Sequence, residues 1–390
     1  MSVTANGRPT IGIGMVGYAF MGRAHSQAWR TVSRAFNVPL VPQLVALAGR
    51  DATRGVAAAH HLGWDHYEMD WHRLIAREDV ELIDVASPGS SHAEISIAAL
   101  RAGKHVLCEK PLANTVEEAE AMAREAASAA KRGVRTMVGF NYRRIPAVTF
   151  ARQLIADGNL GTIRHVRAVF LQDWLVDPAA PMTWRMRKED AGSGALGDIA
   201  AHIIDLTQYL LDDRIAGVSA LAETFVKERP LAADPSRREA VTVDDAVAFV
   251  ARFGNGALAT FEATRFATGR KNSLRFEING ALGSLAFDLE SLNELSYYDG
   301  REPAATRGFR RILVTEATHP YVHAWWPPGH LLGYEHTFTH EVYDLLDAIA
   351  NGRDPVPSFA EGLDVQRVLD AVARSAAGAG WIAVTRERAS

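Results

Sequence analysis

The sequence predicts an α/β protein in which a doubly wound parallel sheet precedes a second, α+β domain. Two observations predict this fold class. Up to about Asn141, short apolar runs alternate with segments of helical periodicity, whereas β-rich runs dominate after about Pro146. The apolar runs of the first part contain few polar residues, as expected when helices cover both faces of a parallel sheet. We therefore expect a domain boundary near residue 145.

Five apolar runs of the first part are expected to form strands, namely 11–15, 44–48, 82–86, 106–108 and 136–138. The helices between them have recognisable start and stop signals. Ser91 and Thr115 each precede a glutamate by three residues, which is typical of a capping box. Gly63, Gly103 and Gly133 stand where the helices are expected to end. Strands and helices that alternate through short turns predict a parallel, doubly wound sheet.

The second part is expected to form a mostly antiparallel sheet with a few helices. Its predicted strands are 163–171, 247–253, 258–264, 274–278 and 284–287, and its predicted helices are 147–156, 198–211, 337–350 and 365–376. The sequences Gly254-Asn255-Gly256 and Asn279-Gly280 stand between strands, where tight antiparallel turns are expected. Residues 228–239 are charged and contain proline, so we expect an exposed loop there.

Composition excludes several classes of protein. The 390 residues include 42 Lys plus Arg and 46 Asp plus Glu, and this net charge of -4 is not that of a nucleic-acid binder. A single cysteine excludes a disulfide framework and fits a reducing compartment. No apolar run reaches the roughly 18 residues of a membrane-spanning helix, and the first residues lack a secretory signal pattern. We expect a cytoplasmic protein that binds neither nucleic acid nor membrane.

The first candidate site is Gly12-Ile13-Gly14-Met15-Val16-Gly17, which we place between the first strand and the helix that follows it. Glycines at such a junction allow a sharp turn and let backbone amides approach a pyrophosphate. The N-terminus of the following helix adds partial positive charge for the phosphates. A purely structural turn is the alternative, but the position at the first β–α junction of an alternating unit favours a dinucleotide site.

The type of cofactor depends on the residues after the second strand, where Ala48-Gly49-Arg50-Asp51 stands. A dinucleotide site usually has an acid there that binds the adenosine ribose hydroxyls. Arg50 can instead bind the 2′-phosphate of NADP, whereas Asp51 can hold a ribose hydroxyl or cap the next helix. We therefore expect NAD or NADP as the cofactor and leave the choice between them open.

Lys110, in the sequence Cys108-Glu109-Lys110-Pro111, follows a predicted parallel strand. Because ligands of open α/β sheets bind outside the carboxyl ends of the strands, we expect Lys110 to face the cofactor crevice. A lysine suits the task of polarising a substrate hydroxyl or relaying its proton. A solvated surface lysine is the alternative, which the stiff Lys-Pro pair disfavours. Cys108 is expected to be a buried core thiol rather than a nucleophile.

A second candidate constellation follows the glycine-rich loop 192–194. Asp198, His202, Asp205 and Tyr209 have helical spacing and form one polar stripe. Histidine is the side chain best suited to accept a proton near neutral pH, and an aspartate one turn away can assist it. An amphipathic helix whose polar face meets water is the alternative. A cofactor site in the other domain makes catalysis the favoured interpretation.

Tryptophans stand beside polar side chains in Gln172-Asp173-Trp174, Trp184-Arg185 and Trp325-Trp326. Flat apolar faces next to hydrogen-bonding groups suit a polyhydroxylated ligand, although a single tryptophan more often belongs to the core.

The late histidines 319, 323, 330, 336 and 340 raise the question of a metal. Only His336 and His340 have helical spacing, and they lack the acidic partner of a zinc motif, so we expect no metal site.

Together these segments resemble the Gfo/Idh/MocA family of sugar, anhydrosugar and inositol oxidoreductases. The matching pieces are the glycine turn running into Phe20-Met21-Gly22, the stretch from Ser87-Pro88 to His92, Glu109-Lys110-Pro111, Asn141-Tyr142-Arg143-Arg144, and Asp198 to His202. They follow the order of the family through both domains, so the resemblance is expected to cover the whole chain. The Glu-Lys-Pro sequence and the Asp-x-x-x-His pair are specific, whereas the glycine turn alone is not.

The resemblance implies a nicotinamide enzyme with Lys110, Asp198 and His202 as its catalytic set. Together with the motifs described above, it predicts cofactor contacts from Gly12, Gly14, Gly17, Phe20, Met21, Arg50, Asp51, Ser87, Pro88, His92, Glu109 and Lys110, and substrate contacts from Asn141, Gln172, Trp174, Trp184, Arg185, Asp198 and His202. It also implies an open-faced second sheet that forms a homo-oligomer, a dimer or a tetramer. Two positions depart from the family pattern: Gly89 replaces a common asparagine, and Gly49-Arg50 replaces an acidic strand end.

These interpretations predict a dinucleotide-binding Rossmann domain at residues 1–145 and a substrate-binding and oligomerisation domain at residues 146–390, with a C-terminal helix packed on the first. The expected activity is NAD(P)-dependent oxidation of a secondary hydroxyl of a pyranose, anhydrosugar or cyclitol. One alternative is a glycosidase that oxidises, eliminates and reduces with a tightly held NAD. Another is a nucleotide-binding sensor without turnover, and a metal-dependent isomerase or lyase is the weakest alternative.

Overall fold

The computed structural model describes residues 7–385, so the first six residues of the segment searched for a secretory signal lie outside them. Its backbone contacts divide the chain into two compact units. The first comprises Met1–Arg144 and Gly333–Leu363, and the second comprises Ile145–Leu332 and Asp364–Ser390. The chain thus returns to the first unit in the segment Gly333–Leu363. The expected domain limits placed this segment in the second domain and expected only a C-terminal helix to pack on the first.

The first unit contains a six-stranded sheet in the order β3-β2-β1-β4-β5-β6. The strands are β1 (Thr10–Val16), β2 (Val41–Ala48), β3 (His66–Glu68), β4 (Leu82–Val85), β5 (His105–Glu109) and β6 (Thr136–Gly139). Every neighbouring pair is parallel, which confirms the predicted sheet. Strand β3 was not predicted because its three residues are too few to show a pattern.

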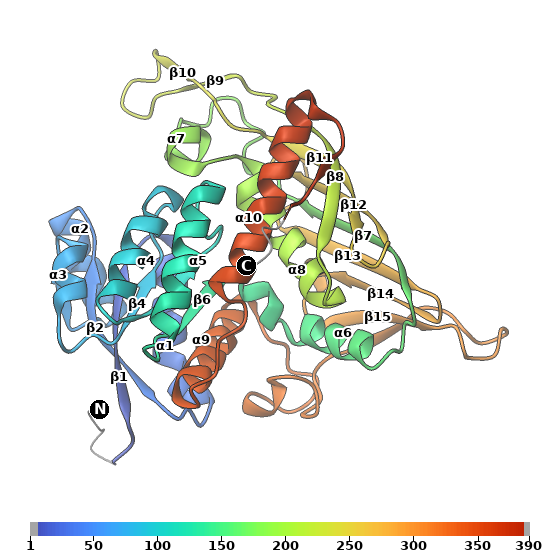
Figure 1. Cartoon of the computed structure of the whole chain (residues 1–390), viewed down its shortest axis with the longest axis horizontal. Coiled ribbons are helices and arrows are strands. Elements are labelled where there is room, and N and C mark those ends of the chain that lie inside the picture. Colours follow the sequence, from blue (N-terminus) through green and yellow to red (C-terminus); the bar gives the residue numbers. More distant parts are fainter. Residues whose placement is uncertain (1–6, 386–390) are drawn as a thin grey trace. The chain divides into compact units, whose positions relative to one another are not determined.

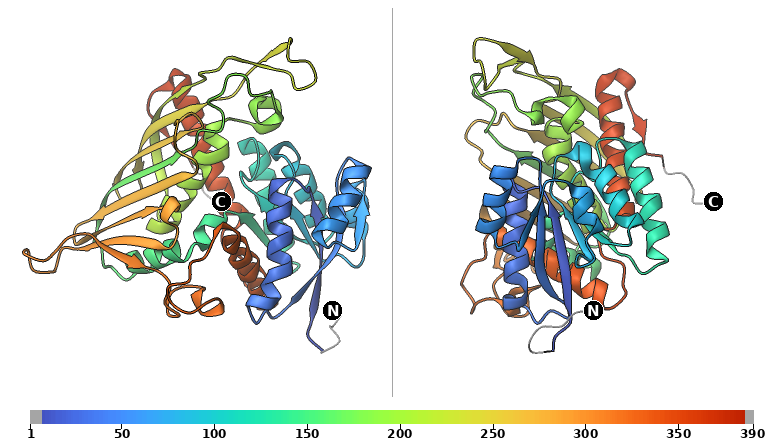
Figure 2. Two further views of the ribbon diagram at one scale, coloured as in Figure 1. Left: turned by 180° about the vertical axis from the view of Figure 1, so that it is seen from behind. Right: turned by 90° about the vertical axis from the view of Figure 1, so that its left-hand side faces the viewer.

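The helices of this unit are α1 (Phe20–Ala35), α2 (Ala52–Leu62), α3 (Trp71–Ala76), α4 (His92–Arg101), α5 (Val116–Ala130) and α9 (Tyr334–Ala350). They form two groups, α1 with α2 and α9, and α4 with α3 and α5, and helices flank both sides of the sheet (Figure 2, right). The capping box from Thr115 to Glu118 is confirmed. The one expected at Ser91 is wrong, because its hydroxyl donates to the carbonyl oxygen of Pro88 at 2.8 Å.

The second unit contains a nine-stranded sheet in the order β16-β15-β14-β13-β7-β12-β11-β8-β17. The strands are β7 (Ile163–Leu171), β8 (Ile215–Glu223), β11 (Ala246–Phe253), β12 (Leu258–Thr264), β13 (Ser273–Gly280), β14 (Gly283–Asp288), β15 (Glu294–Asp299), β16 (Arg310–Leu313) and β17 (Ile382–Ala383). Only the pairing of β7 with β12 is parallel, so the prediction of a mostly antiparallel sheet is confirmed.

The segment expected as an exposed loop is exposed over residues 232–238, but short strands pair at its two ends. Strands β9 (Glu228–Pro230) and β10 (Arg238–Ala240) pair antiparallel. The side chain of Arg229 is 1% exposed, and its guanidinium donates to the carbonyl oxygens of Leu175 and Asp177 at 2.6 and 2.7 Å. An arginine that binds main-chain carbonyls is satisfied inside the protein, which composition alone does not predict.

One face of the nine-stranded sheet is covered by helices α6 (Pro146–Ala156) and α8 (Ala201–Leu211) (Figure 1). Residues on β11 and β12 alternate between buried and exposed, so the other face is open. A short helix, α7 (Lys188–Ala191), precedes the π-helical turn before α8, and α10 (Phe359–Arg374) contains residues of both units. Among residues 7–385, no helix combines the length and the apolar character that crossing a membrane requires.

Candidate functional site

The sharp turn after β1 is formed by Gly17 rather than by all three predicted glycines. Gly12 and Gly14 lie inside β1 and are buried, so their predicted place after the strand is wrong. A Cβ atom on Gly12 would lie 1.8 Å from the carbonyl oxygen of Asp79, so this glycine permits close packing of the strand. Gly17 follows the strand with a φ of 106°, and a Cβ there would lie 2.6 Å from the carbonyl oxygen of Ala86.

The turn from Gly17 to Gly22 has the features that a pyrophosphate requires. A Cβ atom on Gly22 would lie 2.3 Å from the carbonyl oxygen of Gly17, so the start of α1 packs tightly on the turn. Ala19 caps α1 without a side-chain hydrogen bond, and the first turn contains no acidic residue. The amides and partial positive charge of this helix end therefore suit an anion. Phe20 and Met21 begin the helix, and the Phe20 side chain is 53% exposed.

Asp51 caps α2, because its side chain accepts a hydrogen bond from the backbone nitrogen of Arg54 at 3.0 Å. The alternative of a helix cap is thereby confirmed. Arg50, next to it, is exposed. A Cβ atom on Gly49 would lie 2.2 Å from the ring of Tyr18. Packing against this ring therefore leaves no room for the acid that usually ends the second strand of a dinucleotide site.

His92 joins the segments that follow β4 and β5. Its ring nitrogens lie 2.9 Å from the carbonyl oxygen of Ser87 and 3.0 Å from that of Pro111. Burial lowers the pKa of His92 below its ordinary value, so the ring is neutral and donates its single N–H to one of these two carbonyl oxygens. A Cβ atom on Gly89 would lie 2.6 Å from Oδ1 of Asn114, so the Asn114 side chain occupies the space beside this position.

Lys110 and Asn141 follow the carboxyl ends of two neighbouring parallel strands, β5 and β6. This is the edge at which open α/β sheets bind ligands. Lys110 is half-buried, and the Lys110–Pro111 peptide bond is cis. Asn141 is 3% exposed, and its Nδ2 donates to Oγ1 of Thr337 in α9 at 2.8 Å. The predicted position of Lys110 at the end of a strand is confirmed.

A buried cluster of charged side chains lies next to Lys110. His25 of α1 has its Nε2 2.9 Å from Oε1 of Glu109 and its Nδ1 2.9 Å from both carboxylate oxygens of Asp84. The other oxygen of Glu109, Oε2, accepts a hydrogen bond from the backbone nitrogen of Lys110 at 3.0 Å. Glu109 is 4% exposed. Glu109 thus fixes the main chain at Lys110, and its contact with the cofactor stays a prediction.

Sequence reasoning missed His25 and Asp84. Burial acts to lower the pKa of His25, but its contacts with Asp84 and then Glu109 outweigh burial and raise this pKa well above its ordinary value. The protonated imidazole then balances two buried carboxylates. The signal was available in the sequence, because Asp84 is a charged residue inside the otherwise apolar strand LIDV. A charge in such a strand requires a buried partner.

Glu341 of α9 is fully buried close to this cluster. Neither of its carboxylate oxygens has a hydrogen-bond partner among the described residues. Burial raises the pKa of Glu341 from its ordinary value of 4.5 to about 8, and this effect outweighs the opposing influence of His25 and Arg144. The side chain is therefore neutral at pH 7. Because the same carboxyl group loses its proton at a lower pH in the unfolded chain, the stability of the fold falls as the pH rises.

Replacing Glu341 with glutamine should stabilise the protein at neutral and alkaline pH. The folded carboxyl group holds a proton that the unfolded one releases above pH 4.5, so stability falls by at most about 1.4 kcal/mol per pH unit until about pH 8. Glutamine removes this titration. We expect the thermal midpoint of the variant to exceed that of the wild type increasingly from pH 5 to pH 8, and then by a constant amount.

The matched control for this experiment is Glu335→Gln on the same helix, where the side chain is 59% exposed. This substitution removes only an ion pair with His336 and should not reproduce the increase of the thermal midpoint from pH 5 to pH 8. A Glu341→Gln variant whose midpoint follows the wild type at every pH would show that the carboxyl group titrates alike in the folded and unfolded states.

In the second unit, Asp198 belongs to a π-helical turn, Leu196–Ala200, that runs directly into α8. The predicted helix is confirmed, with a wider first turn than expected, and such π turns are frequent at functional sites. The Asp198 side chain is 32% exposed, whereas His202 is 7% and Asp205 1% exposed. The alternative in which the polar face meets water is therefore wrong.

The predicted substrate residues Gln172 and Trp174 lie together after β7. Nε1 of Trp174 donates to Oε1 of Gln172 at 3.0 Å, and Nε2 of Gln172 donates to Oδ1 of Asn272 at 2.7 Å. The Trp174 side chain is 44% exposed. Trp184 and Arg185 form a separate pair, in which the guanidinium carbon lies 4.5 Å from the indole centroid.

The late histidines have structural contacts. Nδ1 of His336 accepts a hydrogen bond from the backbone nitrogen of Gly333 at 3.0 Å, and Nδ1 of His340 lies 2.9 Å from the carbonyl oxygen of Arg144. Within residues 7–385, no group of three or more His, Cys, Asp or Glu side chains is placed to hold a metal ion.

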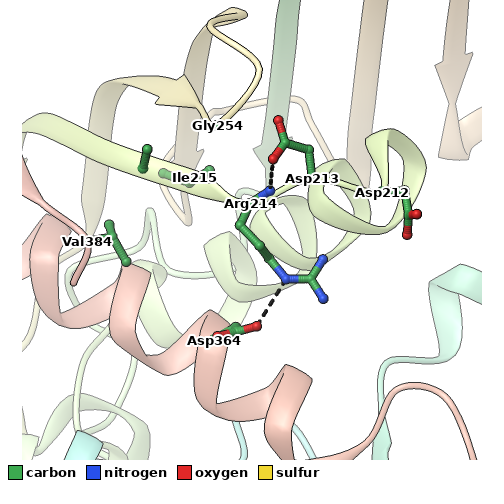
Figure 3. Close-up of a pocket in the computed structure, with 8 residues that line it drawn as sticks. Asp212, Asp213, Arg214, Ile215, Gly254, Asp364 and Val384 are labelled. Carbon is green, nitrogen blue, oxygen red and sulfur yellow. Dashed lines mark hydrogen bonds and ion pairs between the residues drawn. The ribbon is translucent and has the colours of Figure 1, made fainter. Parts of the chain in front are cut away.

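A surface pocket of about 480 Å³ lies at the C-terminal end of α8. In Figure 3, Oδ1 of Asp213 accepts a hydrogen bond from the backbone nitrogen of Arg214 at 2.7 Å, and the Arg214 guanidinium lies 3.0 Å from Asp364. Asp212 has no contact with these side chains in the picture. Asp198 precedes the opposite end of this helix, whose 11 residues span roughly 16 Å. The pocket therefore lies apart from Asp198.

Comparison with known proteins accounts for both parts of the chain. Residues 11–140 match the family model of an oxidoreductase family with an NAD-binding Rossmann fold, and residues 148–286 match the GFO/IDH/MocA C-terminal domain. Levoglucosan dehydrogenase of Pseudarthrobacter phenanthrenivorans is 40% identical over 96% of this chain and 98% of its own length. The chain belongs to the Gfo/Idh/MocA oxidoreductase family.

Solved structures of Gfo/Idh/MocA relatives have the same fold. An oxidoreductase domain protein from Kribbella flavida has a TM-score of 0.95 and 63% identity, covering 97% of this chain and 100% of its own. Levoglucosan dehydrogenase in complex with NADH and levoglucosan has a TM-score of 0.93 and 41% identity, with coverage of 97% and 100%. The expected family is confirmed, and this member is an NAD-binding oxidoreductase.

Proposed function

We propose that this enzyme oxidises a secondary hydroxyl group of a pyranose, an anhydrosugar or a cyclitol. The observation that carries the proposal is the 40% identity to levoglucosan dehydrogenase over 96% of the chain. An inositol 2-dehydrogenase of Rhizobium meliloti is 25% identical over 94% of the chain, and its name indicates another polyhydroxylated ring. The exposed indole of Trp174 beside Gln172 supports a ligand of this kind.

His202 is the general base in this proposal. A ring nitrogen of His202 takes the proton from the substrate hydroxyl, because imidazole is suited to accept a proton near neutral pH. When bound, the nicotinamide supplies the acceptor for the hydride that leaves the carbinol carbon. Proton removal then matches the charge that develops on the oxygen in the transition state. His202 is 7% exposed, which limits its exchange with bulk water.

Lys110 and Asp198 complete the catalytic set. The Lys110 ammonium group polarises the reacting hydroxyl oxygen and stabilises negative charge on it. Glu109 holds the Lys110 backbone through its 3.0 Å hydrogen bond, so the lysine starts from a fixed main-chain position. Asp198 accepts a hydrogen bond from the neighbouring hydroxyl or orients the imidazole, and one helical turn separates it from His202.

For the cofactor, we propose NAD, with the turn from Gly17 to Gly22 binding the pyrophosphate. The positive φ of Gly17 and the uncapped start of α1 support this assignment. Phe20, Met21 and the Ser87-Pro88 segment are the proposed contacts beyond the phosphates. Arg50, which is exposed after β2, is the proposed determinant of any use of NADP, because a guanidinium can bind a 2′-phosphate.

A reduction screen tests the proposal. The wild-type enzyme is offered levoglucosan, myo-inositol and glucose, with NAD and separately with NADP, and nicotinamide absorbance is followed. We expect reduction of NAD with at least one ring. Sugar release without a net change in absorbance would instead indicate the oxidising and eliminating glycosidase. Binding of NADH without turnover of any ring would indicate a sensor, and either result would overturn the proposal.

We also propose that the enzyme is a cytoplasmic homo-oligomer, a dimer or a tetramer. Val250 on β11 and Leu258 on β12 are 42% and 45% exposed on the open face of the nine-stranded sheet. Exposed aliphatic side chains on a regular sheet face suit an interface between copies of one chain. Cys108 is a free, buried cysteine, which is compatible with a reducing compartment.

A further inference from the structure

Arg265, which directly follows β12, is among the largest fully buried side chains of the protein. Burying a guanidinium is costly unless charges and hydrogen bonds compensate it. The proposed chemistry assigns no role to this residue, and neither its position nor its partners could be recognised in the sequence. Its contacts therefore indicate what the buried charge does.

The Arg265 guanidinium reaches two of the predicted substrate residues. Its Nη1 lies 3.9 Å from Oδ2 of Asp198, and its guanidinium carbon lies 5.6 Å from the ring centroid of Trp174. Its Nη2 donates to the carbonyl oxygen of Asp244 at 2.9 Å and lies 3.9 Å from Oδ1 of Asp245. One cation thus lies between a carboxylate and an indole that are distant in the sequence.

The same contacts hold the backbone that leads to Asp198. The two carboxylate oxygens of Asp244 accept hydrogen bonds from the backbone nitrogens of Gly194 and Leu196, both at 2.7 Å. A Cβ atom on Gly194 would lie 1.7 Å from the carbonyl oxygen of Asp244 and 2.7 Å from Nη2 of Arg265. The start of the π-helical turn is therefore packed directly against the guanidinium and its partner.

We propose that Arg265 is a positioning residue of the substrate site. It fixes the Asp198 carboxylate and the Trp174 indole in the relative positions that allow both to contact one sugar ring. The inference rests on the proposed sugar oxidation and adds a determinant of ring recognition to it. The guanidinium beside it restrains the Asp198 carboxylate, whose oxygens accept hydrogen bonds from ring hydroxyls. A cation at the indole face restrains the ring plane on which the sugar lies.

Replacing Arg265 with methionine tests the role, because methionine keeps much of the side-chain length but removes the charge. We expect kcat/KM for the sugar to fall roughly 10- to 100-fold, as displacement of site groups does, mainly through KM, while the Kd for NADH stays within twofold. The Arg265→Lys variant keeps the charge but not the planar guanidinium with its several donors. Its kcat/KM should lie between those of the wild type and Arg265→Met.

The matched control is Arg152→Met. Arg152 also pairs with an aspartate, Asp212 at 3.2 Å, and stacks on an aromatic ring, Tyr209 at 4.4 Å, but it does so at the other end of α8. This variant should keep the wild-type kcat/KM. An equal loss in the Arg152 and Arg265 variants would show that the effect is general destabilisation, and wild-type kcat/KM in Arg265→Met would overturn the positioning role.

Two further measurements make the test decisive. In an Asp198→Asn background, Arg265→Lys should cost much less than it does alone, because its effect passes through Asp198; fully multiplicative losses would contradict the proposal.

Hydrogen exchange of the segment 193–200 requires no substrate and should become faster in Arg265→Lys but not in Arg152→Met. If the wild type oxidises no sugar, the proposed function fails, whereas unchanged exchange in Arg265→Lys overturns the role of Arg265 alone.

Discussion

Replacing His202 with asparagine should lower kcat for sugar oxidation by about two to four decades, which is the usual contribution of a general base. Asparagine fills much of the space of the imidazole and can form hydrogen bonds, but it cannot take a proton at neutral pH. The loss should appear in kcat, whereas the Kd for NADH should stay nearly unchanged. Steady-state kinetics and a fluorescence titration with NADH measure the two quantities.

The control is His319→Asn in the same unit. His319 packs against the ring of Phe150 with a centroid distance of 4.9 Å, and nothing assigns it to the site. Its substitution should leave kcat at the wild-type level. A His202→Asn enzyme with near-wild-type kcat would transfer the role of the base to another group, whereas equal losses in both variants would indicate damage to the fold.

Much of the fold was predictable because its signals are local. Both sheets follow from runs of apolar or alternating residues, and the helices from caps and periodicity within one segment. The predicted helix at 198–211 lies where expected, but its π-helical first turn does not follow from periodicity. That turn depends on the carboxylate of Asp244, which binds the backbone of Gly194 and Leu196 from another part of the chain.

The predicted position of the glycine turn was wrong, and the cause is physical. Gly12 and Gly14 have the spacing of a phosphate loop, yet they lie within β1. The main chain of Asp79 leaves no room for a side chain at Gly12, and the side chains of Leu74 and Val80 crowd Gly14. The glycines that bound the turn are Gly17 and Gly22, with Ala19 in place of the middle glycine. Strand length was the available signal, because an apolar run that continues to Val16 cannot turn at residue 12.

Buried charges were the least predictable part of the site. His25 contacts Asp84 and Glu109, from which it is separated by 59 and 84 residues. Arg265, which follows β12, likewise approaches Asp198 from a distant part of the sequence. Asp84 in its apolar strand indicates that a buried partner exists, but only the folded chain shows which charges compensate one another.

Replacing Lys110 with methionine should lower kcat by about two to three decades, the usual effect of removing one donor that stabilises developing negative charge. Methionine preserves the apolar stem and removes the ammonium group, so packing should change little. Lys110→Arg should not restore activity, because a planar, wider guanidinium cannot occupy the place of a compact point charge. The measurements are kcat, the Kd for NADH and the thermal midpoint of each variant.

The two lysines that flank β5 provide an internal control for this experiment. Lys104 precedes the strand, and its Nζ donates to the carbonyl oxygens of Arg77 and Val80 at 2.9 and 2.7 Å. Lys104→Met should therefore lower the thermal midpoint, because two carbonyl groups lose their donor, yet leave kcat unchanged. The opposite pattern is expected for Lys110, which follows the carboxyl end of the strand, where α/β sheets place their chemistry. Wild-type kcat in Lys110→Met, or a comparable loss in Lys104→Met, would contradict the assignment of Lys110 to the reacting oxygen.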